Sequence, residues 1–253
     1  MPRIVSILSA KGGTGKTTTS INLAAALAQH GQHVIVVDGN LTTPNVSVHL
    51  GIPLYPVTLH DVLRGNAGIK QAVYSHASGI EVVPASLSVE DLDGIDADDL
   101  HSSLESLFTE KGIIIVDGAA GIGKEARAAV ELADEIIIVT NPDMPAVMDA
   151  LKITKLAQRR GTQVSGVIVN RFRGKKYEMP LDDITEMLGV PILGVIHEDS
   201  NVPKSIASKT PLVLYKPWSR AAREFSKVAA ALLGEPEMVP KKTILESLLG
   251  WLH

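Results

Sequence analysis

The sequence predicts a doubly wound α/β fold, with a mostly parallel sheet and helices on both of its faces. Short β-branched runs alternate along the chain with longer segments of helical periodicity. Most of these runs are continuously apolar, which is typical of strands buried on both faces of a parallel sheet. The chain has 253 residues, of which 45% are hydrophobic, and this is enough for one large core. We therefore expect one layered domain with the sheet at its centre.

The expected elements follow one another in a regular order. Strands are predicted at residues 4–8, 34–37, 80–83, 113–116, 136–139, 164–169 and 192–195. Helices are predicted at residues 17–30, 124–133, 146–160, 181–188 and 218–233. The segment GEPEMVP after the last helix contains two prolines and indicates a linker. The expected organisation is a domain over residues 1–234, a linker over 235–240 and a C-terminal amphipathic helix over 241–253.

The composition excludes several classes of function. The net charge of −4 gives no overall positive field, so binding to nucleic acid or anionic lipid requires a local basic patch. The chain has no cysteine, which excludes disulfides, thiolate metal sites and cysteine nucleophiles. The short apolar stretch at the N-terminus runs directly into a glycine-rich loop, and no apolar run approaches the roughly 18 residues of a membrane-spanning helix. We expect a cytoplasmic protein unless it is anchored peripherally.

One acidic run has two interpretations. Residues 89–99, VEDLDGIDADD, carry six carboxylates between a predicted strand and a helix. Carboxylate clusters can bind metal ions, but this run lacks the spacing of a calcium-binding loop. A solvated loop is the simpler interpretation, since charge runs are usually exposed.

The strongest motif is the glycine-rich segment AKGGTGKTT at residues 10–18, which predicts a P-loop for ATP with Mg²⁺. It follows a predicted strand and opens a predicted helix, as a P-loop requires. The loop glycines let backbone N–H groups face phosphate oxygens at the positive end of the helix. The residues expected to bind the nucleotide are Gly12, Gly13, Thr14, Gly15, Lys16, Thr17 and Thr18. Ala10 stands where the generic pattern has glycine, and a glycine-rich turn without a ligand is the alternative.

Each residue of the P-loop has an expected role. Lys16 would reach the β- and γ-phosphates, and Thr17 would place its hydroxyl on Mg²⁺. Asp117 and Asp38 each follow a predicted buried strand, at the edge where ligands bind in open parallel sheets. Both are candidate Mg²⁺ ligands. Either aspartate could instead cap the turn that follows its strand.

These residues carry a resemblance to a known family. KGGTGKTT resembles the deviant Walker A motif of the MinD/ParA family, and MinD-like members, archaeal ones among them, are the nearest match. The likeness extends from Pro2 to about Leu233 through the segments VVDGNLTTPNVSVHLG, IIIVDGAAGIG, IIIVTNPD, GVIVNRF and GVIHEDSNVPKSI. The resemblance implies a P-loop NTPase that hydrolyses ATP and forms a homodimer in its ATP-bound state.

The resemblance also assigns roles to single residues. Lys11 aligns with the lysine that crosses the dimer interface to the phosphates of the partner subunit. Two Lys11 side chains at a twofold axis would repel each other unless each met the partner's ATP, so dimerisation should require the triphosphate. Asn170 matches the family's adenine contact, and the backbone at Glu198 and Asp199 would close the base pocket. A plain strand-end turn is the alternative for Asn170.

The sequence departs from the family pattern in both switch regions. Well-known MinD-like members have Asp-x-Asp in the first switch, whereas this chain has Asp38-Gly39-Asn40. Asparagine can hydrogen-bond a water molecule but cannot take its proton, so we expect slow hydrolysis. Asp38 and Asn45 match positions near the γ-phosphate and could still order the water. Gly118 stands in the second switch where many relatives have serine, and we expect it to loosen the backbone there.

The last residues predict an amphipathic helix at 241–253, KKTILESLLGWLH. Its apolar side chains fall on one helical stripe: Ile244, Leu245, Leu248, Leu249 and Leu252. Lys241 and Lys242 precede the stripe, and Trp251 suits an interfacial depth. The segment resembles the C-terminal membrane-targeting helix of MinD proteins. We expect peripheral association with the cell membrane, and the alternative is docking on the domain itself or on a protein partner.

Two other functions compete with this interpretation. A ParA-type partition ATPase would bind DNA non-specifically, and a local basic density could contact phosphates: Lys152, Lys155, Arg159, Arg160, Arg171, Arg173, Lys175 and Lys176. A solvated helix face followed by a basic loop explains these residues more simply, so DNA is the less favoured partner. A metabolic enzyme or cluster carrier on the same fold would need cysteines or substrate-binding insertions. The activating protein or cargo is not determined by the fold or the ATP site.

Overall fold

The computed structural model describes residues 2–51, 55–88, 91, 99–104, 107 and 112–236. In this part of the chain one sheet has the strand order β3-β4-β2-β5-β1-β6-β7-β8. Its strands are β1 (Arg3–Ser9), β2 (Val34–Gly39), β3 (Tyr74–Ser75), β4 (Glu81–Val83), β5 (Ile113–Ala120), β6 (Glu135–Thr140), β7 (Gln163–Phe172) and β8 (Ile192–His197). Every neighbouring pair is parallel except β3 with β4.

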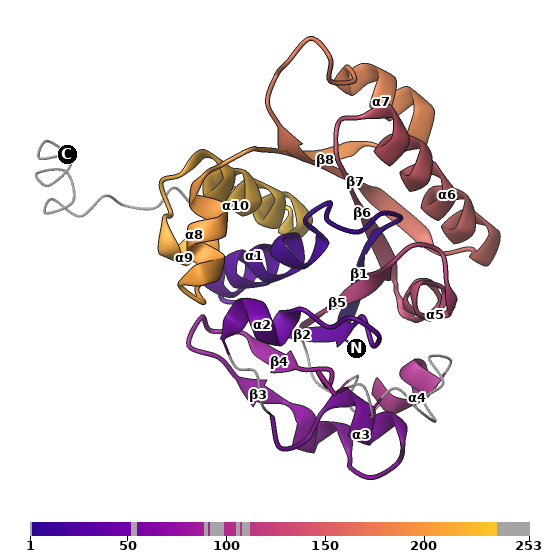
Figure 1. Ribbon diagram of the computed structural model, residues 1–253, viewed down its shortest axis with the longest axis vertical. Helices are drawn as coiled ribbons and strands as arrows, with labels where there is room; N and C mark the ends of the chain where they lie inside the picture. The colour runs from indigo at the N-terminus through magenta and orange to yellow at the C-terminus, as the bar shows by residue number, and fades with distance from the viewer. Residues whose placement is uncertain are drawn as a thin grey trace, which may run out of the picture.

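Helices cover both faces of this sheet (Figure 1). One face packs against α1 (Lys16–Gln29), α2 (Val46–Leu50), α9 (Leu212–Tyr215) and α10 (Arg220–Leu233). The other face packs against α3 (Leu59–Leu63), α4 (Leu100–Leu104), α5 (Lys124–Leu132), α6 (Met144–Arg160) and α7 (Leu181–Leu188). The predicted doubly wound α/β fold is therefore confirmed.

Strand β5 illustrates why the strands are continuously apolar. Successive side chains of a strand point to opposite faces of the sheet. Ile113 and Ile115 enter the core beneath α1 and α10, whereas Ile114 and Val116 enter the core beneath α5 and α6. Because helices cover both faces, every position from Ile113 to Val116 is buried and apolar. The first polar side chain after this run is Asp117, which is also fully buried.

The observed elements differ from the predicted ones mainly at their ends. Helix α6 begins at Met144, two residues before its predicted start, because Asp143 caps it by accepting a hydrogen bond from the Ala146 backbone N–H at 3.0 Å. Strand β5 continues to Ala120, four residues beyond its predicted end. The short elements α2, α3, α4, α8 (Asn201–Ala207), α9, β3 and the 3₁₀ turn Ile69–Ala72 were not predicted. They are too short to produce a recognisable periodicity.

The predicted C-terminal helix, the predicted linker beyond Pro236 and most of the acidic run lie outside the described residues. Of the acidic run the structure describes Asp91 and Asp99. Asp91 accepts hydrogen bonds from Arg64 at 2.7 Å and from the Ser86 hydroxyl at 2.5 Å. These contacts lower the pKa of the Asp91 carboxyl. Within the described ranges, each helix is too short or too polar to cross a bilayer.

Candidate functional site

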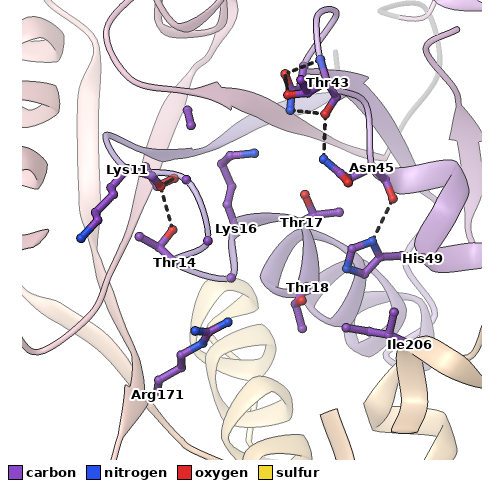
Figure 2. Close-up of a pocket in the computed structure, with 16 residues that line it drawn as sticks. Lys11, Thr14, Lys16, Thr17, Thr18, Thr43, Asn45, His49, Arg171 and Ile206 are labelled. Carbon is purple, nitrogen blue, oxygen red and sulfur yellow. Dashed lines mark hydrogen bonds between the residues drawn. The ribbon is translucent and has the colours of Figure 1, made fainter. Parts of the chain in front are cut away.

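A cavity of about 350 Å³ opens at the carboxyl end of β1 (Figure 2). The segment between β1 and α1 forms one wall, and the loop after β2, the ends of β5 and β7 and the helices α2 and α8 complete the lining. The lining residues are Ser9, Lys11, Gly12, Gly13, Thr14, Gly15, Lys16, Thr17, Thr18, Asn40, Thr43, Asn45, His49, Ala120, Arg171 and Ile206. All of the predicted P-loop except Ala10 is therefore gathered around one cavity.

Glycine is required at position 15 for two reasons. The backbone of Gly15 has a φ of +94°, which L side chains rarely adopt. A Cβ atom at this position would also lie 2.1 Å from Nδ2 of Asn170. The close approach lets the Asn170 side-chain amide donate a hydrogen bond to the Thr14 carbonyl at 2.6 Å. Asn170 thus holds the P-loop against the end of β7.

The two lysines of the loop differ in their surroundings. Lys16 is 7% exposed, and its Nζ lies 3.2 Å from Oδ1 of Asp117. Lys11 is exposed, and Figure 2 shows its side chain pointing away from Lys16 and from the cavity. The ammonium group of Lys11 has no hydrogen bond or ion pair with any residue that the structure describes. One lysine therefore serves the interior of the site, and the other faces solvent.

Asp117 is the centre of a buried polar cluster. Its side chain is fully buried and accepts hydrogen bonds from the Thr17 hydroxyl at 2.6 Å and the Ser20 hydroxyl at 2.9 Å, in addition to the contact with Lys16. A buried carboxylate needs such charge-assisted partners to offset its lost hydration. Ser20 was not predicted as a site residue, although its spacing of four from Lys16 places both on one face of α1.

Asp38 lies beside Asp117, because the two residues are paired across β2 and β5. Its side chain is fully buried and accepts hydrogen bonds from the backbone N–H groups of Asn45 and Val46, both at 3.0 Å. Burial, followed by the repulsion from Asp117, raises the pKa of the Asp38 carboxyl from 3.8 to about 7. A cation held between these two carboxylates would relieve that repulsion.

Asn40 and Asn45 converge on the turn at Thr43. The Asn40 amide donates to the Thr43 carbonyl at 2.6 Å, and its oxygen accepts from the Thr43 N–H at 3.2 Å and the Thr43 hydroxyl at 3.1 Å. The Asn45 amide donates to the same carbonyl at 2.7 Å. Both amides therefore support the loop after β2 at the rim of the cavity. A role of either amide in ordering water stays a prediction.

Glu198 and Asp199 lie at the end of β8 and do not line the cavity. The Glu198 carboxylate pairs with Arg173 at 3.2 Å. The Asp199 carboxylate accepts from the Asn201 backbone N–H at 2.8 Å and supports the start of α8. The cavity is lined on this side by Ile206 of α8 instead. The structure thus brings Asn170 to the P-loop, and the predicted contact of the Glu198 and Asp199 backbone with the base stays a prediction.

Comparison with known proteins identifies the family. The protein-family model of the CobQ/CobB/MinD/ParA nucleotide-binding domain matches residues 5–212 of this chain. The chain belongs to this family. It is 42% identical over 246 residues to an uncharacterised ATP-binding protein of Methanocaldococcus jannaschii, covering 97% of this chain and 93% of the relative. It is 34% identical over 242 residues to the septum site-determining protein MinD of Synechocystis, covering 93% and 91% respectively.

Solved structures of MinD proteins have the same fold. The septum site-determining protein MinD of Pyrococcus horikoshii, complexed with Mg-ADP, has a TM-score of 0.88 at 35% identity, covering 92% of this chain and 96% of that one. MinD in a MinC:MinD complex from Aquifex aeolicus has a TM-score of 0.81 at 29% identity, covering 95% and 98%. The predicted resemblance is confirmed, and the chain is a MinD-like P-loop ATPase of the MinD/ParA family.

Six residues that line the cavity were not predicted as site residues: Ser9, Thr43, His49, Ala120, Arg171 and Ile206. His49 and Ile206 lie on the short helices α2 and α8, which the sequence did not predict. Arg171 was predicted only as part of a basic density. The structure instead places it directly after Asn170 with a φ of +57°, and its side chain extends toward the P-loop in Figure 2.

The rest of the basic density is partly neutralised. Lys152 pairs with Asp149 at 2.7 Å, and Arg160 pairs with Glu131 at 2.8 Å. Arg173 pairs with Glu198, as described above. These ion pairs, together with the place of Arg171 in the cavity, favour a solvated surface over a continuous phosphate-binding patch.

Gly118 has a packing role that was not predicted. It lies inside β5, paired with Gly39 of β2, and is buried. A Cβ atom at this position would lie 2.4 Å from Cδ2 of Leu8. Glycine here therefore allows close packing between β5 and β1, and the expected loosening of the backbone stays a prediction.

Proposed function

We propose that this chain binds ATP with Mg²⁺, forms a homodimer in the ATP-bound state and hydrolyses ATP slowly. We further propose that it associates reversibly with the cell membrane and positions a cellular assembly there. The observation that carries the proposal is the contrast between the two P-loop lysines. Lys16 is buried beside Asp117, whereas Lys11 is exposed and directed away from its own cavity.

The phosphate end of the cavity fits Mg²⁺ and a triphosphate. Lys16 and the backbone of Gly12 to Gly15 bind the phosphates. Thr17, Asp38 and Asp117 offer the hard oxygen atoms that Mg²⁺ prefers, and nucleotide sites hold this ion with only one or two carboxylates besides phosphates. Two buried carboxylates next to a hydroxyl match that set. When bound, Mg²⁺ neutralises charge on the phosphate oxygens.

The face around Lys11 fits a second copy of the chain. Gly121 donates to the Ser9 carbonyl at 3.0 Å, so the segment after β5 lies next to the start of the P-loop. Ile122 in that segment is 45% exposed, and Met144 and Met148 at the start of α6 are 52% and 46% exposed. These apolar side chains follow the strands on either side of β1. A partner subunit would cover them while its ATP neutralised Lys11.

Slow hydrolysis is expected from the residues near the phosphates. Among the described residues, none that lines the cavity carries a carboxylate. Asp38 is fully buried, and its carboxylate oxygens accept hydrogen bonds from backbone N–H groups. The Asn40 side chain is hydrogen-bonded to Thr43. Phosphoryl transfer depends mainly on positioning and electrostatics, so turnover continues without a strong base. A protein activator or cargo would then set the rate at which ATP is hydrolysed and the dimer dissociates.

Membrane association depends on the segment 241–253. One such helix inserts a modest apolar surface and binds reversibly, whereas two helices on one ATP dimer bind with avidity because the second insertion is intramolecular. The bound nucleotide would thereby control the time spent on the membrane. DNA remains the less favoured alternative partner.

Sedimentation with liposomes tests this proposal. The full-length chain is expected to pellet with anionic vesicles in ATP more than in ADP, and a chain truncated after Val239 is expected to stay in the supernatant in both. Equal pelleting in ATP and ADP, or by the truncated chain, would remove the membrane association. ATP-dependent, salt-sensitive retardation of DNA would favour the partition ATPase instead.

A further inference from the structure

His49 brings an imidazole ring into the nucleotide cavity from α2. Its ring Nδ1 lies 2.9 Å from the Asn45 carbonyl oxygen, which also accepts from the His49 backbone N–H at 3.0 Å. Figure 2 shows the ring directed into the cavity, with Thr18 and Ile206 both near it. The ring is therefore fixed in orientation by the first turn of its own helix.

The hydrogen bond to Asn45 determines the tautomer of the ring. A backbone carbonyl can only accept, so Nδ1 of His49 carries the proton. In the neutral ring Nε2 is then an acceptor. Burial, assisted by the nearby cations Lys209 and Lys16, lowers the pKa of His49 against the opposing effects of Asn45 and Asp117. The ring is thus neutral at pH 7, with its acceptor nitrogen on the cavity side.

The position of His49 along the cavity corresponds to the sugar of a bound nucleotide. The phosphates lie at the N-terminus of α1, where Lys16 and Thr17 are found. The nucleoside must extend from there past Thr18, toward the residues His49, Ile206 and Arg171 that complete the lining. The ribose is joined directly to the α-phosphate, so its hydroxyl groups come next. A hydroxyl group can donate a hydrogen bond to the unprotonated nitrogen of a neutral imidazole.

We propose that Nε2 of His49 accepts a hydrogen bond from a ribose hydroxyl of the bound nucleotide and makes the site selective for ribonucleotides over deoxyribonucleotides. The inference rests on the proposed nucleotide binding and adds a specificity-determining residue to it. A site built to hydrogen-bond a hydroxyl discriminates against a ligand that lacks it, because the acceptor that the bound nucleotide covers is then left unpaired.

Calorimetric titration with Mg-ADP, Mg-2′-deoxy-ADP and Mg-3′-deoxy-ADP tests the proposal. Diphosphates avoid hydrolysis, and the two deoxy forms separate the two hydroxyls. The wild type is expected to bind ADP about 3- to 10-fold more tightly than one of the deoxy forms, as one neutral hydrogen bond implies. In His49→Phe, which keeps a planar ring without an acceptor, the affinity for ADP should fall to that for the deoxy form. His49→Gln, which offers an amide oxygen, should restore part of the preference.

The outcomes separate this inference from the proposed function. Equal affinity of the wild type for all three diphosphates would overturn the role of His49, and this comparison needs no variant to fold. A preference that persists unchanged in His49→Phe would also overturn it. ADP binding that tightens several-fold from pH 8 to pH 6 in the wild type alone would indicate a charged imidazole on a phosphate instead. Failure of the wild type to bind ADP at all would overturn the proposed function itself.

Discussion

Asn40→Asp is expected to raise the rate of ATP hydrolysis while lowering the stability of the free protein. The substitution removes the donor that reaches the Thr43 carbonyl at 2.6 Å and sets a carboxylate oxygen against that carbonyl. Loss of a largely buried hydrogen bond of this kind costs about 1–3 kcal/mol. For a domain of this size the melting temperature should fall by about 2–10 °C.

The same carboxylate would stand at the rim of the cavity, where the family pattern has an aspartate. A positioned base accelerates a proton transfer by a factor on the order of 10² or more, so single-turnover hydrolysis should rise by about that factor. Rapid-quench measurement of ADP formation by preloaded protein gives the rate. Asn40→Ala is the control, because it also loses the bond to the Thr43 carbonyl, together with the two bonds that the Asn40 oxygen accepts, and gains no base. It should lose stability without gaining rate. An unchanged rate in Asn40→Asp would refute this explanation of slow hydrolysis.

Three further predictions concern the buried part of the site. Gly15→Ala forces a Cβ to within 2.1 Å of Asn170 at a φ of +94°, so nucleotide binding measured by calorimetry should be lost, whereas Gly31→Ala, at a φ of +76° with open space around it, should bind normally. Ser20→Ala removes one donor from the buried Asp117 carboxylate and should lower the free energy of unfolding by about 1–3 kcal/mol in urea. Ser226→Ala is its control, because this variant loses only a hydrogen bond to the Ala222 carbonyl one helical turn earlier. Equal losses of unfolding free energy in the two variants would show that the polar cluster around Asp117 adds no stability. The folded-state pKa of Asp38, about 7, lies above its ordinary value of 3.8, so the stability associated with its protonated form is present below pH 3.8 and is lost as the pH rises toward 7. Nucleotide-free protein should therefore show a fall in stability between pH 4 and 7 that is smaller in Asp38→Asn, and identical pH profiles for the two proteins would contradict the raised pKa.

The sequence predicted the features that depend on local pattern. Continuous apolar runs located every long strand, because helices cover both faces of the sheet. The P-loop, Asp38 and Asp117 were found because each stands directly after such a run. The pairing of Asp38 with Asp117 follows from the order of the strands, which the sequence alone did not provide.

Features that depend on tertiary contacts were missed or misread. Ser20 looks like an ordinary helical serine until β5 brings Asp117 to its hydroxyl. His49 and Ile206 lie on helices of five and seven residues, which are too short to show a period. The sequence suggested that Gly118 gives the backbone conformational freedom, whereas the structure shows that it allows close contact with Leu8 of the neighbouring strand β1. Arg171 was grouped with surface cations because its left-handed backbone conformation is not visible in the sequence.

We propose that Lys11 acts across a dimer interface and not in its own cavity. Light scattering of the protein after size-exclusion chromatography, with a non-hydrolysable ATP analogue and Mg²⁺, tests it most directly. The wild type should have the mass of a dimer with the analogue and of a monomer with ADP. Lys11→Ala should remain monomeric with the analogue while calorimetry shows that its affinity for ADP is unchanged. A Lys11→Ala protein that still dimerises with the analogue, or that has lost ADP binding, would contradict the claim.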